Sequence, residues 1–386
     1  MHMMLRPHSR QWSAILATAI CLLLAADMGL TALDPAPEGS FTVAVIPDTQ
    51  HYRGRGTKAQ RDSEDPVTNP NFEALTPWIV RNLDSQRIVF VTHVGDIVDI
   101  NTPDQWQVAR KCMDVLHGVV PYGISVGNHD MTSAGDSSLF QEYFGSERFE
   151  QFEWYGGAYP GNDELGPAVS GNNANSYQLL SAEGVNLIFL HLECNAPDDV
   201  LAWAEEVLEE HGDRWGFVTT HMYLGPLKTP TTAEGWFDDP KGRMRWHKIH
   251  KERGNTPQQL WEKLFSRHPN IVAVQAGDQS RTQAIRLRSR GIEGNIVNEM
   301  MFDYGGGRNV RLLRFMPRQN RVQAITWDVQ GRCPVESSSR VTDRGQWQFS
   351  FRHDFGVSCA GQRARPVEHG RLAHPALKWA GRLMFR

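Results

Sequence analysis

The feature of this chain that most constrains its fold is a series of short apolar runs separated by helix-like segments. The runs have the length of buried strands and are Thr42–Pro47, Ile88–Thr92, Tyr122–Val126, Val185–Leu192, Phe217–Thr220 and Ile271–Ala276. Thr102 and Thr256 each precede a proline and lie three residues before a glutamine, which is a helix start signal. Apolar residues between Val200 and Leu208 repeat at helical spacing. Strands that alternate with helices predict an α/β domain.

The rest of the chain sets the expected boundaries of that domain. Short β-like runs, Val310–Phe315 and Arg321–Trp327, follow the alternating part, so we expect one domain over residues 40–330. Two long stretches rich in Gly, Pro, Asn and Trp, Met131–Ser181 and Met222–Asn255, are predicted to be functional loops. A C-terminal extension over 331–386 follows. From about residue 361 it carries six Arg or Lys against one Glu, which predicts a disordered basic tail, with a basic surface helix as the alternative.

The N-terminus has the pattern of an export signal. Arg6 and Arg10 precede an apolar stretch, Ala14–Ala26, which Asp27 ends before it reaches the length of a membrane span. We therefore expect a signal peptide over residues 1–32, with cleavage after Ala26 or Ala32 as alternatives, and a periplasmic or secreted protein with no transmembrane segment after signal removal. A retained N-terminal anchor is the other interpretation. The formal charge of −4 argues against a nucleic-acid-binding protein.

Chemically active side chains follow the ends of five of the predicted strands. They are Asp48, Asp96, the pair Asn128 and His129, His221, and Asp278. Each alone is ordinary turn chemistry, but the tetrapeptide Gly127–Asp130 (GNHD) is expected by chance in roughly one chain per thousand of this length. In α/β sheets, ligands bind at the carboxyl ends of the strands, so the joint pattern predicts a metal-binding site.

These motifs resemble those of the calcineurin-like metallophosphoesterase superfamily. The resemblance covers about Phe41 to Asp278 and extends to about Trp327. It is strongest to a bacterial exported branch whose first motif is PDTQ, here Pro47–Gln50. The segments WIVRNL, THVGDIVD, QWQVA, VPYGISVGNHD and FDYGGG fit the same branch. The resemblance implies a β-sandwich flanked by helices, a four-layer α/β/β/α fold, and a centre of two divalent metal ions that hydrolyses phosphoesters.

The resemblance also implies which residues hold the metal ions. Asp96 would bridge them, Asp48 would bind the first ion, and Asn128 and His221 would bind the second. Gln50 would offer an amide oxygen to the first ion, where many relatives have histidine. Mn²⁺, Fe, Mg²⁺ and Zn²⁺ are all compatible with oxygen and imidazole ligands.

The last motif departs from the family pattern. Relatives have Gly-His-x-His where this chain has Gly277-Asp278-Gln279-Ser280. Asp278 could bind the second ion through oxygen, whereas Ser280 is a poor ligand. The first metal site is therefore short of ligands.

The resemblance assigns proton transfer to the GNHD turn. His129 would be the general acid that protonates the leaving oxygen, and Asp99 would hold its imidazole. A capping contact within the turn is the alternative role for His129. Asp130 is expected to stabilise the turn rather than bind metal.

These assignments predict an exported metal-dependent phosphoesterase that hydrolyses a small-molecule phosphomonoester or phosphodiester. One alternative is a catalytically degenerate protein of the same fold that binds a phosphorylated ligand, and another is a one-metal hydrolase. Trp154, Tyr155, Trp236 and Trp246 would either stack on substrate or pack. The sequence leaves the substrate and the oligomeric state open.

Overall fold

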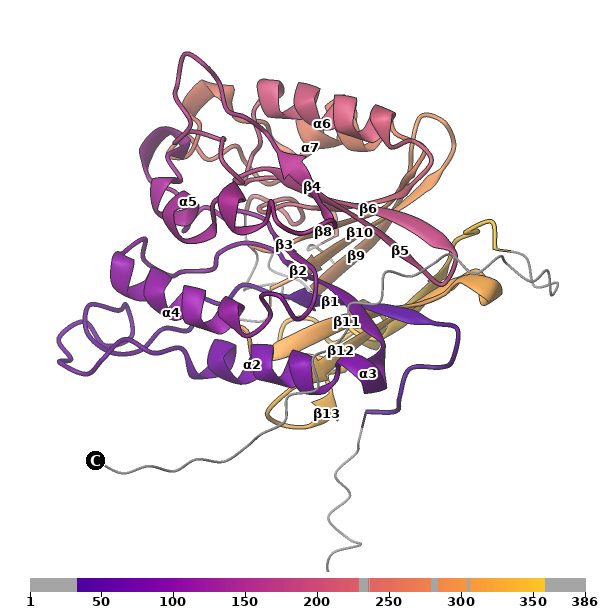
Figure 1. Ribbon diagram of the computed structural model, residues 1–386, viewed down its shortest axis with the longest axis horizontal. Helices are drawn as coiled ribbons and strands as arrows, with labels where there is room; N and C mark the ends of the chain where they lie inside the picture. The colour runs from indigo at the N-terminus through magenta and orange to yellow at the C-terminus, as the bar shows by residue number, and fades with distance from the viewer. Residues whose placement is uncertain (1–32, 229–234, 236, 279–283, 304–305, 358–386) are drawn as a thin grey trace, which may run out of the picture.

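The protein is built from two β-sheets that pack face to face, with helices on the outer side of each (Figure 1). The computed structural model describes residues 33–228, 235, 237–278, 284–303 and 306–357. The expected signal peptide and the basic tail lie outside these residues. The predicted four-layer α/β/β/α fold is confirmed.

The first sheet contains the N-terminal strands of the predicted domain. Its order is β13-β12-β11-β1-β2-β3, and β14 also pairs with β12. The bounds are β1 Phe41–Ile46, β2 Ile88–His93, β3 Tyr122–Ile124, β11 Asn309–Met316, β12 Arg321–Asp328, β13 Cys333–Pro334 and β14 Phe349–Arg352. Strands β1, β2 and β3 are parallel, and β11 is antiparallel to β1. The carboxyl ends of the three parallel strands therefore share one edge.

The second sheet has the order β4-β5-β6-β7-β8-β10-β9. The bounds are β4 Tyr155–Ala158, β5 Ser176–Ala182, β6 Val185–His191, β7 Trp215–Thr219, β8 Ile271–Ala276, β9 Ala284–Arg290 and β10 Ile296–Phe302. Strands β6, β7, β8 and β10 are parallel, so their carboxyl ends also meet at one edge. All six strands expected from the apolar runs are present.

Helices cover the outer face of each sheet. On the first sheet lie α2 (Pro70–Arg81), α3 (Leu83–Gln86), α4 (Pro103–Asp114) and α5 (Ser138–Phe144). On the second lie α6 (Asp198–Glu210) and α7 (Pro257–Leu260), and a π-helical turn, Trp261–Phe265, continues α7. The predicted capping box at Thr256 is formed, because its side chain accepts from the Gln259 backbone and the Gln259 side chain accepts in return.

The two sheets are held together by an aromatic and aliphatic core. The rings of Phe90 on β2 and Phe189 on β6 stack with their centroids 3.9 Å apart. Trp347 and Phe351 join the same core. Since both residues come from the expected C-terminal extension, and β13 and β14 pair with β12, the packed unit continues past residue 330.

The first long stretch expected to be a loop contains several short elements of secondary structure. Residues 131–181 contain α5, β4 and most of β5. The apolar residues of α5, Phe140 and Phe144, are fully buried against Trp106 of α4. The helix is only seven residues long, so its helical pattern of apolar residues is too short to stand out in a sequence rich in Gly, Asn and Pro. Within the described part of the chain, every helix is too short or too polar to span a membrane.

Candidate metal centre

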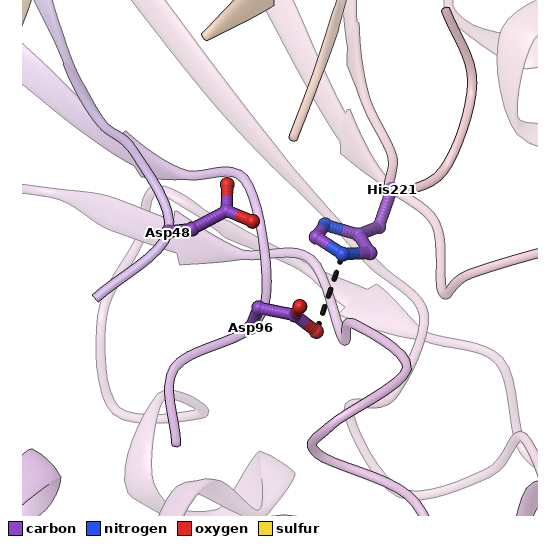
Figure 2. Close-up of side chains that lie close together, drawn as sticks. All are labelled: Asp48, Asp96 and His221. Carbon is purple, nitrogen blue, oxygen red and sulfur yellow. Dashed lines mark ion pairs between the residues drawn. The ribbon is translucent and has the colours of Figure 1, made fainter. Parts of the chain in front are cut away.

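Asp48, Asp96 and His221 converge where the carboxyl edges of the two sheets meet. Asp48 follows β1, Asp96 follows β2 and His221 follows β7. One ligand atom from each lies within 4.8 Å of the others, and the three side chains point toward one another (Figure 2). All three are buried, with relative exposures of 1%, 2% and 0%. The structure thus brings together three of the six predicted metal ligands in one cluster.

Three glycines allow the loops to approach this closely. A Cβ at Gly127 would lie 2.2 Å from the Asp96 Oδ1, and one at Gly277 would lie 2.2 Å from the Asp48 Oδ1. A Cβ at Gly95 would lie 2.9 Å from the His221 Nδ1, and Gly95 also has a φ of +100°, which favours glycine. Loops without side chains at these positions are therefore a condition for the cluster.

The ring of His221 is oriented for metal binding. Its Nδ1–H donates to the Val94 carbonyl oxygen over 2.8 Å. The Nε2 lies 3.2 Å from the Asp96 Oδ1. A backbone acceptor on one ring nitrogen is the usual way in which a protein fixes the tautomer of a metal-binding histidine.

The charges of the cluster act strongly on one another. Burial, and then the nearby charge of Asp303, raise the pKa of Asp48 well above its usual value. Burial is the largest single influence on Asp96 and opposes its ionisation, but His221 and His129 together outweigh it, so the pKa of Asp96 is lowered. Burial opposes the charged form of His221 too, yet Asp96 raises its pKa well above the usual value. The imidazolium balances one carboxylate, whereas a divalent cation would balance both and displace its proton.

Buried atoms without partners give an independent test of whether a metal ion fits. Asp48 Oδ1 and Asn128 Oδ1 have no hydrogen-bond partner among the described residues, and the His221 Nε2 has only its ion-pair contact with Asp96. Leaving a buried polar atom unpaired costs about 1–3 kcal/mol. A carboxylate oxygen, an amide oxygen and an imidazole nitrogen are all ordinary ligands of divalent metals. The residues present therefore fit a divalent metal ion.

Asp130 ties the GNHD turn to the loop after β2. Its Oδ1 accepts from the backbone N–H groups of Ile97 and Val98, and its Oδ2 accepts from Gly127. The same turn directs the His129 backbone N–H to the Asp96 Oδ1 over 2.9 Å. The expected structural role of Asp130 is confirmed.

Gln50 and Asp278 lie beside the cluster, and the side chain of each is already paired with another side chain of the protein. The Gln50 Nε2 donates to the Asp96 Oδ2 over 2.8 Å, so the amide nitrogen faces the carboxylate. The Asp278 backbone N–H donates to the Asp48 Oδ2 over 3.1 Å, and its carboxylate pairs with the Arg243 guanidinium. Their roles as metal ligands remain predictions. Gln279 and Ser280 lie outside the described residues.

His129 lies at the rim of the cluster with a partly exposed ring. Its Nδ1–H donates to the backbone carbonyl oxygen of Asp99 over 2.7 Å, and its Nε2 lies 4.0 Å from the Asp96 Oδ2. The Asp99 carboxylate lies 3.8 Å from the ring and instead forms a 2.6 Å ion pair with Lys58. Asp99 therefore holds the imidazole through its backbone rather than its side chain.

Sequence reasoning missed three charged residues of this region. Lys58 lies in a polar loop and Arg243 in a stretch expected to be a loop, and neither carries a recognisable signal. Asp303 follows β10, is 2% exposed, and acts on Asp48. Its position directly after a strand, within the FDYGGG segment, is the signal that could have identified it.

The aromatic residues proposed as stacking groups pack within the protein. Trp154 stacks on Phe152 with ring centroids 5.1 Å apart, and the Tyr155 hydroxyl donates to Asn173. Trp246 packs against the core between α2, α4 and the first sheet. Trp236 lies outside the described residues.

Replacing Gly127 by alanine tests the close approach of the loops. We expect Gly127→Ala to displace Asp96 and lower metal affinity by roughly 10- to 100-fold, the cost of losing a residue that orients a metal ligand. Metal retained after dialysis against a weak chelator measures the effect. Gly212→Ala is the control, because its Cβ would meet no atom closer than 3.4 Å. Equal metal retention in both variants would contradict the packing argument.

Comparisons with known proteins place the chain in a family. Residues 41–278 match the family described as calcineurin-like phosphoesterase. An uncharacterized protein of Bacillus subtilis (strain 168), YvnB, is 28% identical over 305 residues, which cover 76% of this chain and 20% of that protein. The chain thus spans about a fifth of the length of that relative.

Two similar solved structures are nucleotidases. A 5′-nucleotidase precursor from Thermus thermophilus has a TM-score of 0.41 and 13% identity, covering 76% of this chain and 52% of that one. The NAD nucleotidase of Haemophilus influenzae has a TM-score of 0.42 and 13% identity, covering 75% of this chain and 47% of that one. The family match over residues 41–278 covers more than half of the sequence. The chain therefore belongs to the calcineurin-like phosphoesterase family.

Proposed function

We propose that this protein is an exported metal-dependent phosphoesterase that hydrolyses a small-molecule phosphomonoester or phosphodiester. The observation that carries the proposal is the buried cluster of Asp48, Asp96 and His221, in which the oxygen atoms Asp48 Oδ1 and Asn128 Oδ1 have no hydrogen-bond partner among the described residues. The family supports the reaction class. The signal-like N-terminus supports export.

In the proposed centre, Asp96 would contribute to both of two divalent ions. Asp48 and Gln50 would hold the first ion, and Asn128, His221 and Asp278 would hold the second. Gln50 needs only a half-turn of its amide to present oxygen in place of nitrogen. Bound divalent ions would offset the negative charge of the phosphoester and make a bound water more acidic.

His129 is the proposed proton donor. The Asp99 carbonyl oxygen fixes its Nδ1–H, so Nε2 is the atom that carries the proton to the leaving oxygen. The His129 side chain is 27% exposed, which leaves room for a substrate to reach its ring. Lys58, held by Asp99 beside the ring, is positioned to attract an anionic ester.

A one-metal hydrolase is the second candidate, and one observation favours it. The Asp278 carboxylate is already paired with Arg243, so an ion that uses Asp278 would have to compete with a guanidinium. In that case one ion uses the Asn128 and His221 side alone, and Arg243 supplies a fixed positive charge beside it. Counting the bound ions separates the two candidates.

Removing the central carboxylate tests the proposed chemistry. Asp96→Asn is expected to lower kcat/KM for a generic aryl phosphate by at least about 100-fold, since residues that only orient a metal ligand already cost roughly 10- to 100-fold. The assay is hydrolysis of p-nitrophenyl phosphate and its bis ester in the presence of Mn²⁺. Asp213→Asn, an exposed carboxylate in the turn before β7, is the matched control. Full activity in Asp96→Asn would refute the assignment.

The leaving group tests the role of His129. Aryl phosphates have acidic leaving groups that need little protonation, so we expect His129→Asn to slow alkyl phosphates by roughly 100- to 10,000-fold and aryl phosphates much less. Steady-state kinetics on both substrate types measure the difference. Equal losses on the two types would show that His129 is not the acid.

A further inference from the structure

Four arginines line one hollow at the edges of the two sheets. The hollow has a volume of about 490 Å³. Its lining consists of Arg286 and Arg288 on β9, Arg321 on β12, and Ser350, Phe351 and Arg352 on β14. The lining contains no carboxylate from the described residues, so the hollow concentrates positive charge.

Two of these arginines lie directly opposite each other. Arg321 is the register partner of Arg352 in the antiparallel pair of β12 and β14. Like charges at directly opposed positions destabilise a sheet, because their side chains lie on the same face. The Arg321 guanidinium donates to the Ser350 Oγ over 3.0 Å, which keeps it in the hollow. An anion between the two guanidinium groups would attract both of them and offset their mutual repulsion.

The other two arginines come from the last strand of the second sheet. Arg286 and Arg288 are two residues apart on β9, so both side chains lie on one face of the strand. The Arg286 guanidinium carbon lies 4.4 Å from the centre of the Phe349 ring, and its Nε is buried without a partner among the described residues. Burial, and then the charge of Arg288, lower the pKa of Arg286.

Several arginines elsewhere on the surface of the protein are paired with carboxylates, unlike those of the hollow. Arg308 pairs with Asp328, and Arg344 pairs with Glu336. These surface arginines have an acidic neighbour within the chain, whereas the described lining of the hollow offers only cations, a hydroxyl and an aromatic ring. The missing charge must therefore come from solvent or from a ligand.

The hollow is separate from the metal centre. β12 runs parallel to β1, because both are antiparallel to β11. Arg321 begins β12, so it lies at the edge opposite the one that carries Asp48. Arg288 pairs with Asn298 near the start of β10, which also places it away from the catalytic edge.

We propose that this arginine hollow is a second anion-binding site, which takes a small multivalent oxyanion such as a sulfate or a phosphate group. The planar guanidinium group donates two parallel hydrogen bonds to such oxyanions, and four of them around one hollow favour a divalent over a monovalent anion. The site holds its ligand independently of the metal centre.

Sulfate is the probe that tests the proposal. We would titrate the metal-loaded protein with sodium sulfate by calorimetry and by thermal unfolding, with sodium chloride added to keep the ionic strength constant. The wild type should bind one sulfate at the hollow, in addition to any sulfate held by the metal ions, and unfold at a higher temperature, because a ligand of the folded state stabilises it. The double variant Arg321→Gln/Arg352→Gln should bind roughly 10- to 100-fold more weakly, since it loses hydrogen bonds between charged groups.

Three further variants make the result decisive. Arg288→Gln alters one exposed side chain and should also weaken binding, which covers the case in which the double variant does not fold. Arg81→Gln, an exposed arginine on α2, should bind sulfate as the wild type does. Asp96→Asn should retain sulfate binding while losing activity, which separates this site from the proposed catalytic function.

Two results would overturn the proposal. One is sulfate binding that is absent or unaffected by the arginine substitutions. The other is binding of the sulfated polymer heparin without binding of free sulfate, because it would indicate an extended surface rather than a site for a small anion.

Discussion

The structure depends on two buried carboxylates, Asp48 and Asp96, held at the meeting point of two sheets. Buried charges of one sign are costly unless a cation compensates for them. The one imidazole of His221 balances a single carboxylate, and unpartnered ligand atoms remain around it among the described residues. A divalent cation would both balance the remaining negative charge and bind the buried ligand atoms that have no hydrogen-bond partner. The fold therefore makes most physical sense as the scaffold of a metal centre.

The architecture delivers these groups by simple means. Parallel strands bring their carboxyl ends to one edge, and the face-to-face sheets bring two such edges together. Glycines at 95, 127 and 277 then let three loops touch without side chains between them. Charged residues around the cluster are paired in turn, with Lys58 on Asp99 and Arg243 on Asp278. These pairs place two fixed cations beside the centre, as an anionic substrate requires.

The sequence was most informative where local pattern and tertiary structure agree. All six apolar runs form strands, because buried parallel strands need continuous apolar sequence, and Asp48 and Asp96 follow two of them. The contacts of Gln50, Arg243 and Lys58 could not be predicted, since they depend on how distant loops meet. The small helix α5 and strand β14 were missed for a related reason: their few apolar residues gain meaning only from the aromatic cores that they complete.

The number of metal ions bound by the metal-free protein tests the account most directly. Calorimetric titration of the chain that begins after the proposed signal peptide, with Mn²⁺ and with Zn²⁺, gives this number. The account predicts two equivalents in the wild type and loss of tight binding in Asp96→Asn. One equivalent would support the one-metal hydrolase that uses the Asn128 and His221 side alone. No binding of either metal would contradict the central claim and favour a protein of this fold that binds a phosphorylated ligand without hydrolysing it.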